Sequence, residues 1–194
     1  MSFDTHMTTY IVIAAVVILA AYGVLIYNQL VALKHGVARS WANIDVLLKQ
    51  RHDELPKLVE SCRQYMRYEQ ETLERVMKAR SAVSTAQSKG DIPALGQAEG
   101  QLRAGLMQLF AVVEAYPELK ANETFQHLQA RVTGLENDIA DRRELYNESV
   151  NVNNVRIEQF PDLIVARMFG FGGHPLLEFA TEEKTDPSLR TLFG

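Results

Sequence analysis

The stretch that decides the fold is YIVIAAVVILAAYGVLIY, residues 10–27, and no formally charged residue stands between Asp4 and Lys34. An α-helix rises about 1.5 Å per residue, so the mostly apolar residues 8–30 are long enough to cross about 30 Å of hydrocarbon. Tyrosines near both ends of the stretch suit the membrane interface. The sequence therefore predicts a transmembrane helix over residues 8–30 in contact with membrane lipid, after a short extracytoplasmic segment, residues 1–7.

The flanks of this stretch predict its direction. Basic residues follow it, at Lys34, Arg39, Lys49 and Arg51, whereas MSFDTHMTT before it has no Lys or Arg. The positive-inside rule then places the N-terminus outside and the rest of the chain in the cytoplasm. A cleaved signal peptide is the alternative, but it needs a basic start and an A-x-A-like site, which the sequence does not offer.

The composition is that of a globular protein that does not bind nucleic acid. The chain has 194 residues, and its 20 basic and 24 acidic residues give a formal net charge of −4. Binding to a phosphate backbone needs an excess of Lys and Arg, so we expect no nucleic-acid partner. The one cysteine, Cys62, excludes an internal disulfide and any multi-cysteine metal site.

The rest of the chain has helical periodicity. Apolar residues spaced by three and four run from Val37 to about Ser88, which predicts one long amphipathic helix. Pro56 lies inside it, and because the apolar register continues past the proline we expect a kink at that position and no end. Strict alternation of apolar and polar residues, the pattern of strands, is absent. The fold class is therefore all-α.

Turn signals divide the remaining helices. Gly90 and Asp91 predict the end of the first helix and the N-cap of a second. Pro117 ends that second helix, and Asn122 is the expected N-cap of a third, which runs along a narrow apolar seam typical of bundles or coiled coils. A short helix is expected over residues 163–168. We predict a cytoplasmic helical domain over residues 31–168 and a flexible C-terminal tail over residues 169–194, whose aromatic residues are free to contact a partner, the membrane or the bundle.

Motifs that carry catalysis are absent from the sequence. The five histidines lie in different segments, none forms H-E-x-x-H, and none has a glutamate three residues before it, as a di-iron bundle requires. Glu123 and His127 are one helical turn apart, which suits a metal pair but is more often a surface pair. We expect no enzyme activity, no cofactor and no metal, with Cys62 as a core residue.

Three polar clusters lie on or beside the apolar seams. Arg51-His52-Asp53-Glu54, with Asp45 before it, indicates either a solvated face or an ion-pair set completed by another helix or protomer, because buried charges must be paired. The segment 114–120 is interpreted as a capped corner. Asn147, Asn151 and Asn154 recur in the third helix at steps of four and three, which favours amides that fix the register against a facing helix, with a polar ligand or partner groove as the alternative.

The chain resembles the LemA family between Tyr27 and Pro161. The resemblance is carried, in order, by YNQLVALKHGV, Trp41, IDVLLKQRHDELPKLVE, YMRYEQETLERVMKAR, EAYPELKANETFQHLQ and ENDIADRRELYNESVNVNN. The sequence departs from the family pattern at Lys34, His35 and Gln50, and the glycine-rich tail matches no pattern of the family.

The resemblance implies an antiparallel bundle of long helices on a single-pass anchor in the bacterial cytoplasmic membrane, without an established enzyme activity. It also implies neighbourhood links to membrane metalloproteases of the heat-shock type and a relative in magnetosome membrane organisation. With the asparagine stripe added, the expected interaction and structural motif positions are Asn28, Trp41, Asp45, Arg51, Asp53, Pro56, Tyr116, Pro117, Asn122, Glu136, Arg142, Tyr146, Asn147, Asn151 and Asn154.

Two functions remain open from the sequence. The first is a membrane-anchored scaffold whose helical domain forms homo-oligomers and organises a membrane patch or complex. The second is an adaptor or sensor that presents substrates or signals to a membrane metalloprotease or a signalling partner. Fold does not decide between them.

Overall fold

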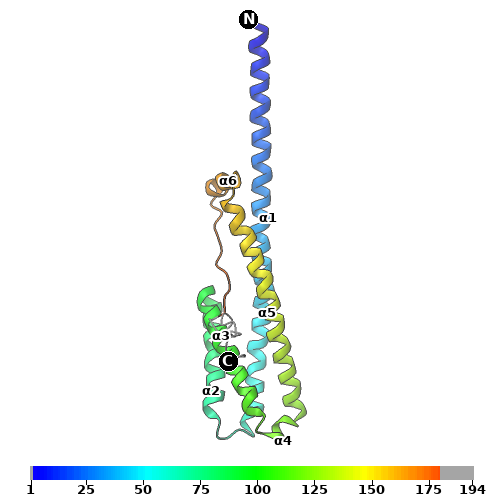
Figure 1. Ribbon diagram of the computed structural model, residues 1–194, viewed down its shortest axis with the longest axis vertical. Coiled ribbons are helices and arrows are strands. Elements are labelled where there is room, and N and C mark those ends of the chain that lie inside the picture. The colour runs from blue at the N-terminus through cyan, green and yellow to red at the C-terminus, as the bar shows by residue number, and fades with distance from the viewer. Residues whose placement is uncertain (1, 180–194) are drawn as a thin grey trace, which may run out of the picture. The chain divides into compact units, whose positions relative to one another are not determined.

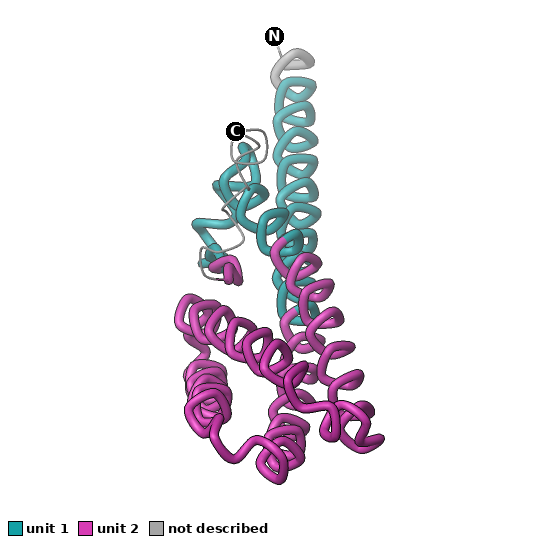
Figure 2. Tube along the Cα trace, turned by 60° about the horizontal axis from the view of Figure 1, so that its bottom comes forward, with its two compact units in different colours: residues 1–40, 148–174 teal, residues 41–147, 175–194 magenta. Residues whose placement is uncertain are grey.

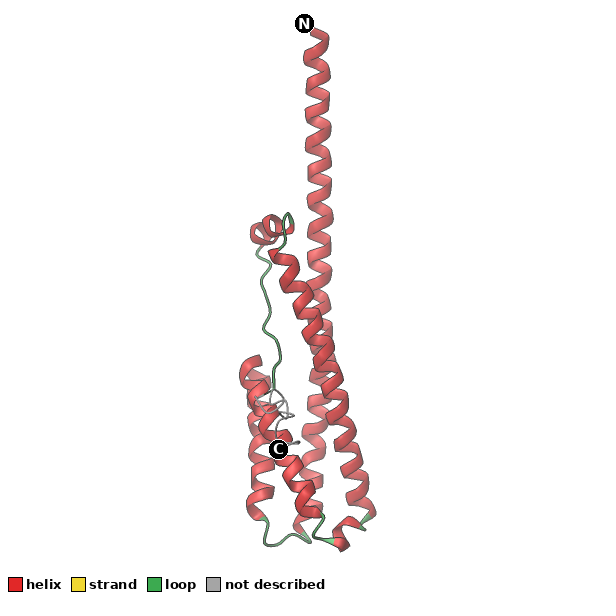
Figure 3. Cartoon of the chain, in the orientation of Figure 1, coloured by secondary structure: helices red, strands yellow, loops and turns green. Residues whose placement is uncertain are grey.

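The computed structural model describes residues 2–179, and every regular element in them is a helix (Figure 1, Figure 3). The elements are α1 (Ser2–Arg63), α2 (Gln70–Lys89), α3 (Ile92–Val113), α4 (Pro117–Lys120), α5 (Glu123–Glu158) and α6 (Asp162–Phe169). Residues 2–179 contain no strand. The all-α prediction is therefore confirmed for the described chain.

The chain divides into two compact units, coloured separately in Figure 2. The first unit contains residues 1–40 and 148–174, and the second contains residues 41–147 and 175–194. The long helices α1 and α5 each contribute to both units.

The second unit is held together by an apolar core to which four helices contribute. The stripes that the spacing predicts point inward from α1, α2, α3 and α5, since their apolar members are almost fully buried. Burying a side chain of this size stabilises the fold by about 1.5–3 kcal/mol. The core includes Ile44, Leu48, Leu55, Leu58, Val76, Leu102, Leu109, Val132 and Ile139.

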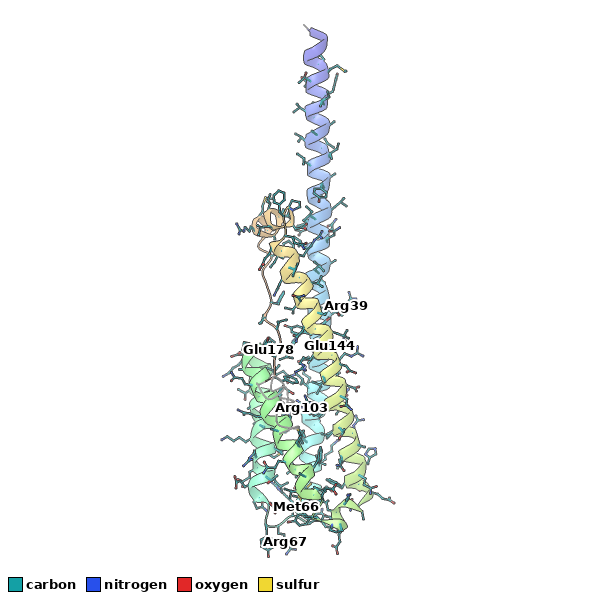
Figure 4. All side chains as sticks on the ribbon, viewed as in Figure 1. Arg39, Met66, Arg67, Arg103, Glu144 and Glu178 are labelled. Atoms are coloured by element: carbon teal, nitrogen blue, oxygen red, sulfur yellow. The ribbon has the colours of Figure 1, made fainter. Side chains whose placement is uncertain are left out.

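The prediction of one helix as far as Ser88 is wrong, because α1 ends at Arg63 and α2 begins at Gln70. The amides of Tyr65 and Met66 both donate to the carbonyl of Cys62 and close the last turn of α1. Met66 is fully buried and anchors the corner, which Figure 4 labels together with Arg67. The corner contains neither Gly nor Pro, so tertiary packing overrides the local helix preference.

The helix ends that carry turn residues lie where the sequence predicts them. Gly90 has φ 67° and closes α2 in the left-handed conformation. The Asp91 carboxylate caps α3 by accepting a hydrogen bond of 3.0 Å from the Ala94 amide. The Asn122 side chain caps α5 in the same way, with 3.0 Å to the Phe125 amide. These two hydrogen bonds confirm Asp91 and Asn122 as N-caps.

The helix α1 continues through Pro56, as the unbroken apolar register indicates. A proline has no amide hydrogen, so the carbonyl of His52 loses its partner within the helix. Arg80 of α2 supplies the replacement, because its Nε donates to the His52 carbonyl oxygen at 2.8 Å. A side chain from the neighbouring helix thus completes the backbone bonding that the proline interrupts.

The first unit packs α6 against α1 near the end of the apolar stretch. Ile26 and Leu30 of α1 are buried together with Val165 and Ala166 of α6. The Tyr27 ring meets the ring of Phe169 edge-on, with centroids 4.8 Å apart. The short helix expected over residues 163–168 is thereby confirmed, with one more residue at each end.

The helix α1 is long and apolar enough to cross a membrane, with a most apolar window of mean hydropathy 2.5. The apolar side chains of residues 10–19 are exposed in the described chain. This helix is the one candidate span among the described residues.

Candidate functional sites: a buried ion cluster and an asparagine stripe

A buried ion cluster joins three helices of the second unit. The Arg51 guanidinium on α1 donates to Glu99 Oε1 of α3 at 2.5 Å and to Glu136 Oε1 of α5 at 2.6 Å. Arg51 is 1% exposed and Glu99 is 2% exposed, whereas Glu136 is 20% exposed on its side chain. The partners of Arg51 therefore come from two other helices of the same chain.

One guanidinium faces two carboxyl groups in this cluster. Burial raises the pKa of Glu99, and the nearby Glu136 carboxylate raises it further, while Arg51 acts in the opposite direction. A buried pair of this kind contributes little net stability, but loss of one partner costs much more because it leaves a charge unpaired. We therefore expect the cluster to fix the register of α1, α3 and α5 more than it adds to stability.

Two other titratable groups of the predicted Arg51 cluster, Asp45 and His52, contact α2. Hydrogen bonds from Lys49 and Gln87 lower the pKa of Asp45, whose Oδ1 lies 2.7 Å from Gln87 Nε2. Burial, followed by the charge of Arg80, lowers the pKa of His52. The His52 Nε2 atom lies 2.6 Å from an Arg80 nitrogen and accepts its hydrogen, which only the neutral ring can do.

Asparagines on α5 hold the main chain of the C-terminal segment, residues 170–179. In the first unit, Asn154 accepts from the His174 amide and donates to the His174 carbonyl, both at 2.9 Å. In the second unit, Asn147 accepts from the Leu177 amide at 2.8 Å and donates to the Leu177 carbonyl at 3.1 Å. Each asparagine therefore satisfies both backbone groups of one residue, and we call such a pair of hydrogen bonds a rung.

Neighbouring side chains support each rung within its own unit. Asn153 donates to the Gly172 carbonyl at 3.3 Å in the first unit. In the second unit, the Tyr146 hydroxyl donates to the Pro175 carbonyl at 3.0 Å. Leu177 is buried there, and the Arg143 guanidinium stacks 4.1 Å above the Phe179 ring.

Two predictions about this region differ from the structure. Asn147 and Asn154 of the asparagine stripe bind the main chain of the C-terminal segment and not a facing helix, because a helix has already used its own amides and carbonyls. The expected tail begins at Phe169, which is the last residue of α6, and residues 170–179 are held along α5 by hydrogen bonds from α5 side chains to their main chain. Residues 180–194 of that expected tail lie outside the described residues.

A glycine lets the C-terminal segment approach α3. A Cβ atom built on Gly96 would lie 1.9 Å from the carbonyl oxygen of Glu178, which no side chain can tolerate. Glu178 and Arg103 of α3 are both labelled in Figure 4. Gly96 is therefore required for the close contact between the segment and α3 in the second unit.

Aromatic and amide groups pack the corners of the second unit. Trp41 and Tyr146 have ring centroids 5.6 Å apart, and the Asn122 amide donates to the Tyr65 hydroxyl at 3.3 Å. Tyr116 lies just before α4 with its hydroxyl 3.5 Å from Glu69. These positions serve packing and capping.

The remaining predicted positions do not join the ion cluster or the rungs. They are exposed side chains on α1, α4 and α5. They are Asn28, Asp53, Pro117, Arg142 and Asn151.

Sequence reasoning missed several residues that complete these sites. No pattern in the sequence identifies Glu99 as the partner of Arg51. Its position as the single acidic residue of α3 is nevertheless a usable signal. In the sequence, Arg80 interrupts the apolar spacing of α2, and a charged residue at such a position is a usable signal. Gly96 and Asn153 carried no distinguishing signal.

Among residues 6–179, no group of three or more His, Cys, Asp or Glu side chains is arranged to hold a metal ion. The described chain combines a long apolar N-terminal helix with a helical unit that contains a buried ion cluster. This defines an all-helical protein with one candidate membrane helix.

The family model of the LemA family matches residues 40–190, and the chain belongs to that family. The match extends past Pro161, where the resemblance recognised from the motifs ended, and takes in the segment that is held along α5.

Curated relatives include two magnetosome proteins of Paramagnetospirillum magneticum, MamQ 1 and MamQ 2, each 33% identical over 99 residues. The magnetosome protein MamQ of Magnetospirillum gryphiswaldense is 31% identical over 99 residues. Each match covers 51% of this chain and 36% of the relative, so the chain spans about a third of the relatives' length. Neither the family description nor these names state an enzyme activity.

Proposed function

We propose that the protein is a non-enzymatic scaffold, anchored in the bacterial cytoplasmic membrane by residues 8–30 with its N-terminus outside. The helices of the second unit form an antiparallel bundle in the cytoplasm. Copies of this bundle associate with one another and organise a membrane patch or complex.

The observation that carries this proposal is the continuity of α1. One helix runs from the exposed apolar stretch into the second unit, and no loop separates the two parts. A protein that had to reach a distant substrate would benefit from a flexible linker at this point. A continuous helix instead suits a protein whose task is to place its cytoplasmic part at the membrane.

The relatives support a membrane role. The matched MamQ proteins are named as magnetosome proteins, and the shared region includes about half of this chain. We propose that this chain organises a membrane and does not catalyse a reaction.

Self-association needs a face that the monomer leaves uncovered. Val46 on α1 and Met107 on α3 are large apolar side chains that stay exposed in the second unit. Single exposed apolar residues are common, so these two positions are candidates whose role a variant can test.

The test is the mass and shape of the full-length protein in native lipid particles, by light scattering and electron microscopy of one sample. We expect ordered oligomers, and a smaller mass for Val46→Glu. Gln50→Glu is the matched control, because it adds the same charge at an exposed polar position one turn further along α1. A strictly monomeric wild-type protein at micromolar concentration would contradict the scaffold and favour the adaptor.

A further inference from the structure

The helix α6 leaves a second apolar face uncovered. Val165 and Ala166 on one side pack against α1, but Ile164 is 56% exposed and Met168 is 68% exposed. These two residues are four apart and share a face of the helix. Phe160, just before the helix, is 81% exposed.

The position of α6 indicates what covers this face. Within the first unit, α6 packs on Ile26 and Leu30, which belong to the last two turns of the apolar stretch 8–30. Any membrane that contains this stretch therefore has its interface at the level of α6.

The side chains around α6 suit the boundary between hydrocarbon and headgroups. Tyr27 contacts the rings of Phe169 and Phe171, with centroids 4.8 and 5.7 Å away. Aromatic rings concentrate at this depth in membrane proteins. Arg167 is exposed on α6, where a cation can meet lipid phosphates.

We infer that α6, with Phe160, is an interfacial helix that inserts its exposed apolar face into the cytoplasmic leaflet beside the anchor. This inference rests on the proposed membrane anchor. It gives the protein a second contact with lipid, from a segment more than 130 residues further along the chain than the span. The leaflet thereby covers Phe160, Ile164 and Met168, which are exposed in the first unit.

The experiment uses the full chain in vesicles of phosphatidylethanolamine and phosphatidylglycerol. Cys62 is fully buried and burial raises the pKa of its thiol to about 12, so the unaltered chain is the labelling blank. A polarity-sensitive fluorophore is attached to Ile164→Cys, and to Met168→Cys as a second variant. Ala38→Cys, exposed on α1 about 12 Å beyond Leu30 at 1.5 Å per residue, is the matched control.

We expect the labels at positions 164 and 168 to be quenched by lipids spin-labelled near the headgroup, with blue-shifted emission and several-fold weaker quenching by iodide than at position 38. Labels at 164 and 168 that behave like the label at 38 overturn the inference. Labels shielded from both lipid and iodide also overturn it, because a second copy or another protein then covers the face.

A label at Val17→Cys, inside the apolar stretch, separates the two failures. Quenching of this label by lipids spin-labelled deep in the bilayer supports the anchor, whatever α6 does. If this label is not quenched by lipid at all, the anchor itself is wrong and the inference falls with it.

Discussion

Replacing Arg51 with methionine tests the buried ion cluster most directly. The change removes the hydrogen bonds of 2.5 Å to Glu99 and 2.6 Å to Glu136 and leaves both carboxylates without their cation. Glu136 is partly exposed and can turn to water, but Glu99 is 2% exposed and cannot. We expect Arg51→Met to lower the free energy of unfolding by about 3–5 kcal/mol at neutral pH, nearly all of it from Glu99.

The assay is urea unfolding of the full chain in detergent, followed by tryptophan fluorescence. Trp41 is the single tryptophan of the sequence and lies in the second unit beside Tyr146, so its emission reports on the unit that contains the cluster. Lys57→Met is the matched control on the same helix. Its pair with Glu54, at 3.2 Å, is exposed and contributes about 0–1 kcal/mol.

The pH dependence gives an independent check. The pKa of Glu99 in the folded state is raised by burial, so the folded protein takes up a proton on Glu99 before the unfolded chain does as the pH falls. Loss of Arg51 removes the group that lowers this pKa and raises it further. The penalty of Arg51→Met therefore becomes smaller as the pH falls toward the ordinary value of Glu, 4.5.

Two results would refute this account of the cluster. One is a penalty for Arg51→Met no larger than that for Lys57→Met at neutral pH, and the other is a penalty that grows as the pH falls. The double variant Arg51→Met/Glu99→Met should recover much of the lost stability, because it removes the buried charge together with its partner.

Three further predictions concern the side chains of Asn147, Arg80 and His52. Asn147→Ala removes both hydrogen bonds to Leu177 and should speed hydrogen exchange of the Leu177 amide by an amount equivalent to about 1–3 kcal/mol, whereas unchanged exchange would dismiss the rung. Arg80→Ala should lower the free energy of unfolding in the urea titration by about 1–3 kcal/mol, because it leaves the His52 carbonyl without a donor. The loss should be smaller in a Pro56→Ala background, where residue 56 has a backbone amide that can donate to this carbonyl. Additive effects of the two substitutions would contradict this coupling. The pKa of His52 in the folded protein lies below its ordinary 6.5, so its contribution to stability should be fully present above pH 6.5 and be lost as the pH falls from 6.5 through the lower folded pKa. His52→Gln should lack this pH-dependent loss of stability. A pH profile of stability identical to that of the unaltered chain would contradict the prediction.

Local signals in the sequence were sufficient where one residue decides the backbone conformation. Gly90 closes α2 because a glycine readily adopts the left-handed φ that this position has. Asp91 and Asn122 cap helices with their own side chains. Each of these contacts spans a few residues, so the spacing in the sequence contains the whole interaction.

The break between α1 and α2 shows where such signals fail. Both helices carry apolar stripes in the same register because both face the same core, so the pattern alone does not distinguish one long helix from two. Glu69 gave the only hint, since it interrupts the stripe and stands just before α2. What ends α1 is the burial of Met66 in the corner, which depends on the rest of the fold.

Local sequence patterns also do not identify the partners of buried polar residues. The pattern around Arg51 raised the possibility of an ion pair from another helix, but no spacing rule connects it to Glu99, 48 residues away. Burial of a charge implies that it has a partner, but the sequence pattern does not identify that partner.

The asparagines of α5 can be explained by comparing the rise of a helix with that of an extended chain. Asn147 and Asn154 are seven residues apart on one helix, which is about 10.5 Å at 1.5 Å per residue. Leu177 and His174 are three residues apart in an extended segment, which is about 10 Å at 3.3 Å per residue. The two repeats match, and the segment runs opposite to α5 as the partner numbers fall while the helix numbers rise. The side-chain amide of asparagine has an NH2 group that donates beside an oxygen that accepts, so it can bind the main-chain carbonyl and amide of a residue of any type. Asn151 lies off this seven-residue repeat and is exposed.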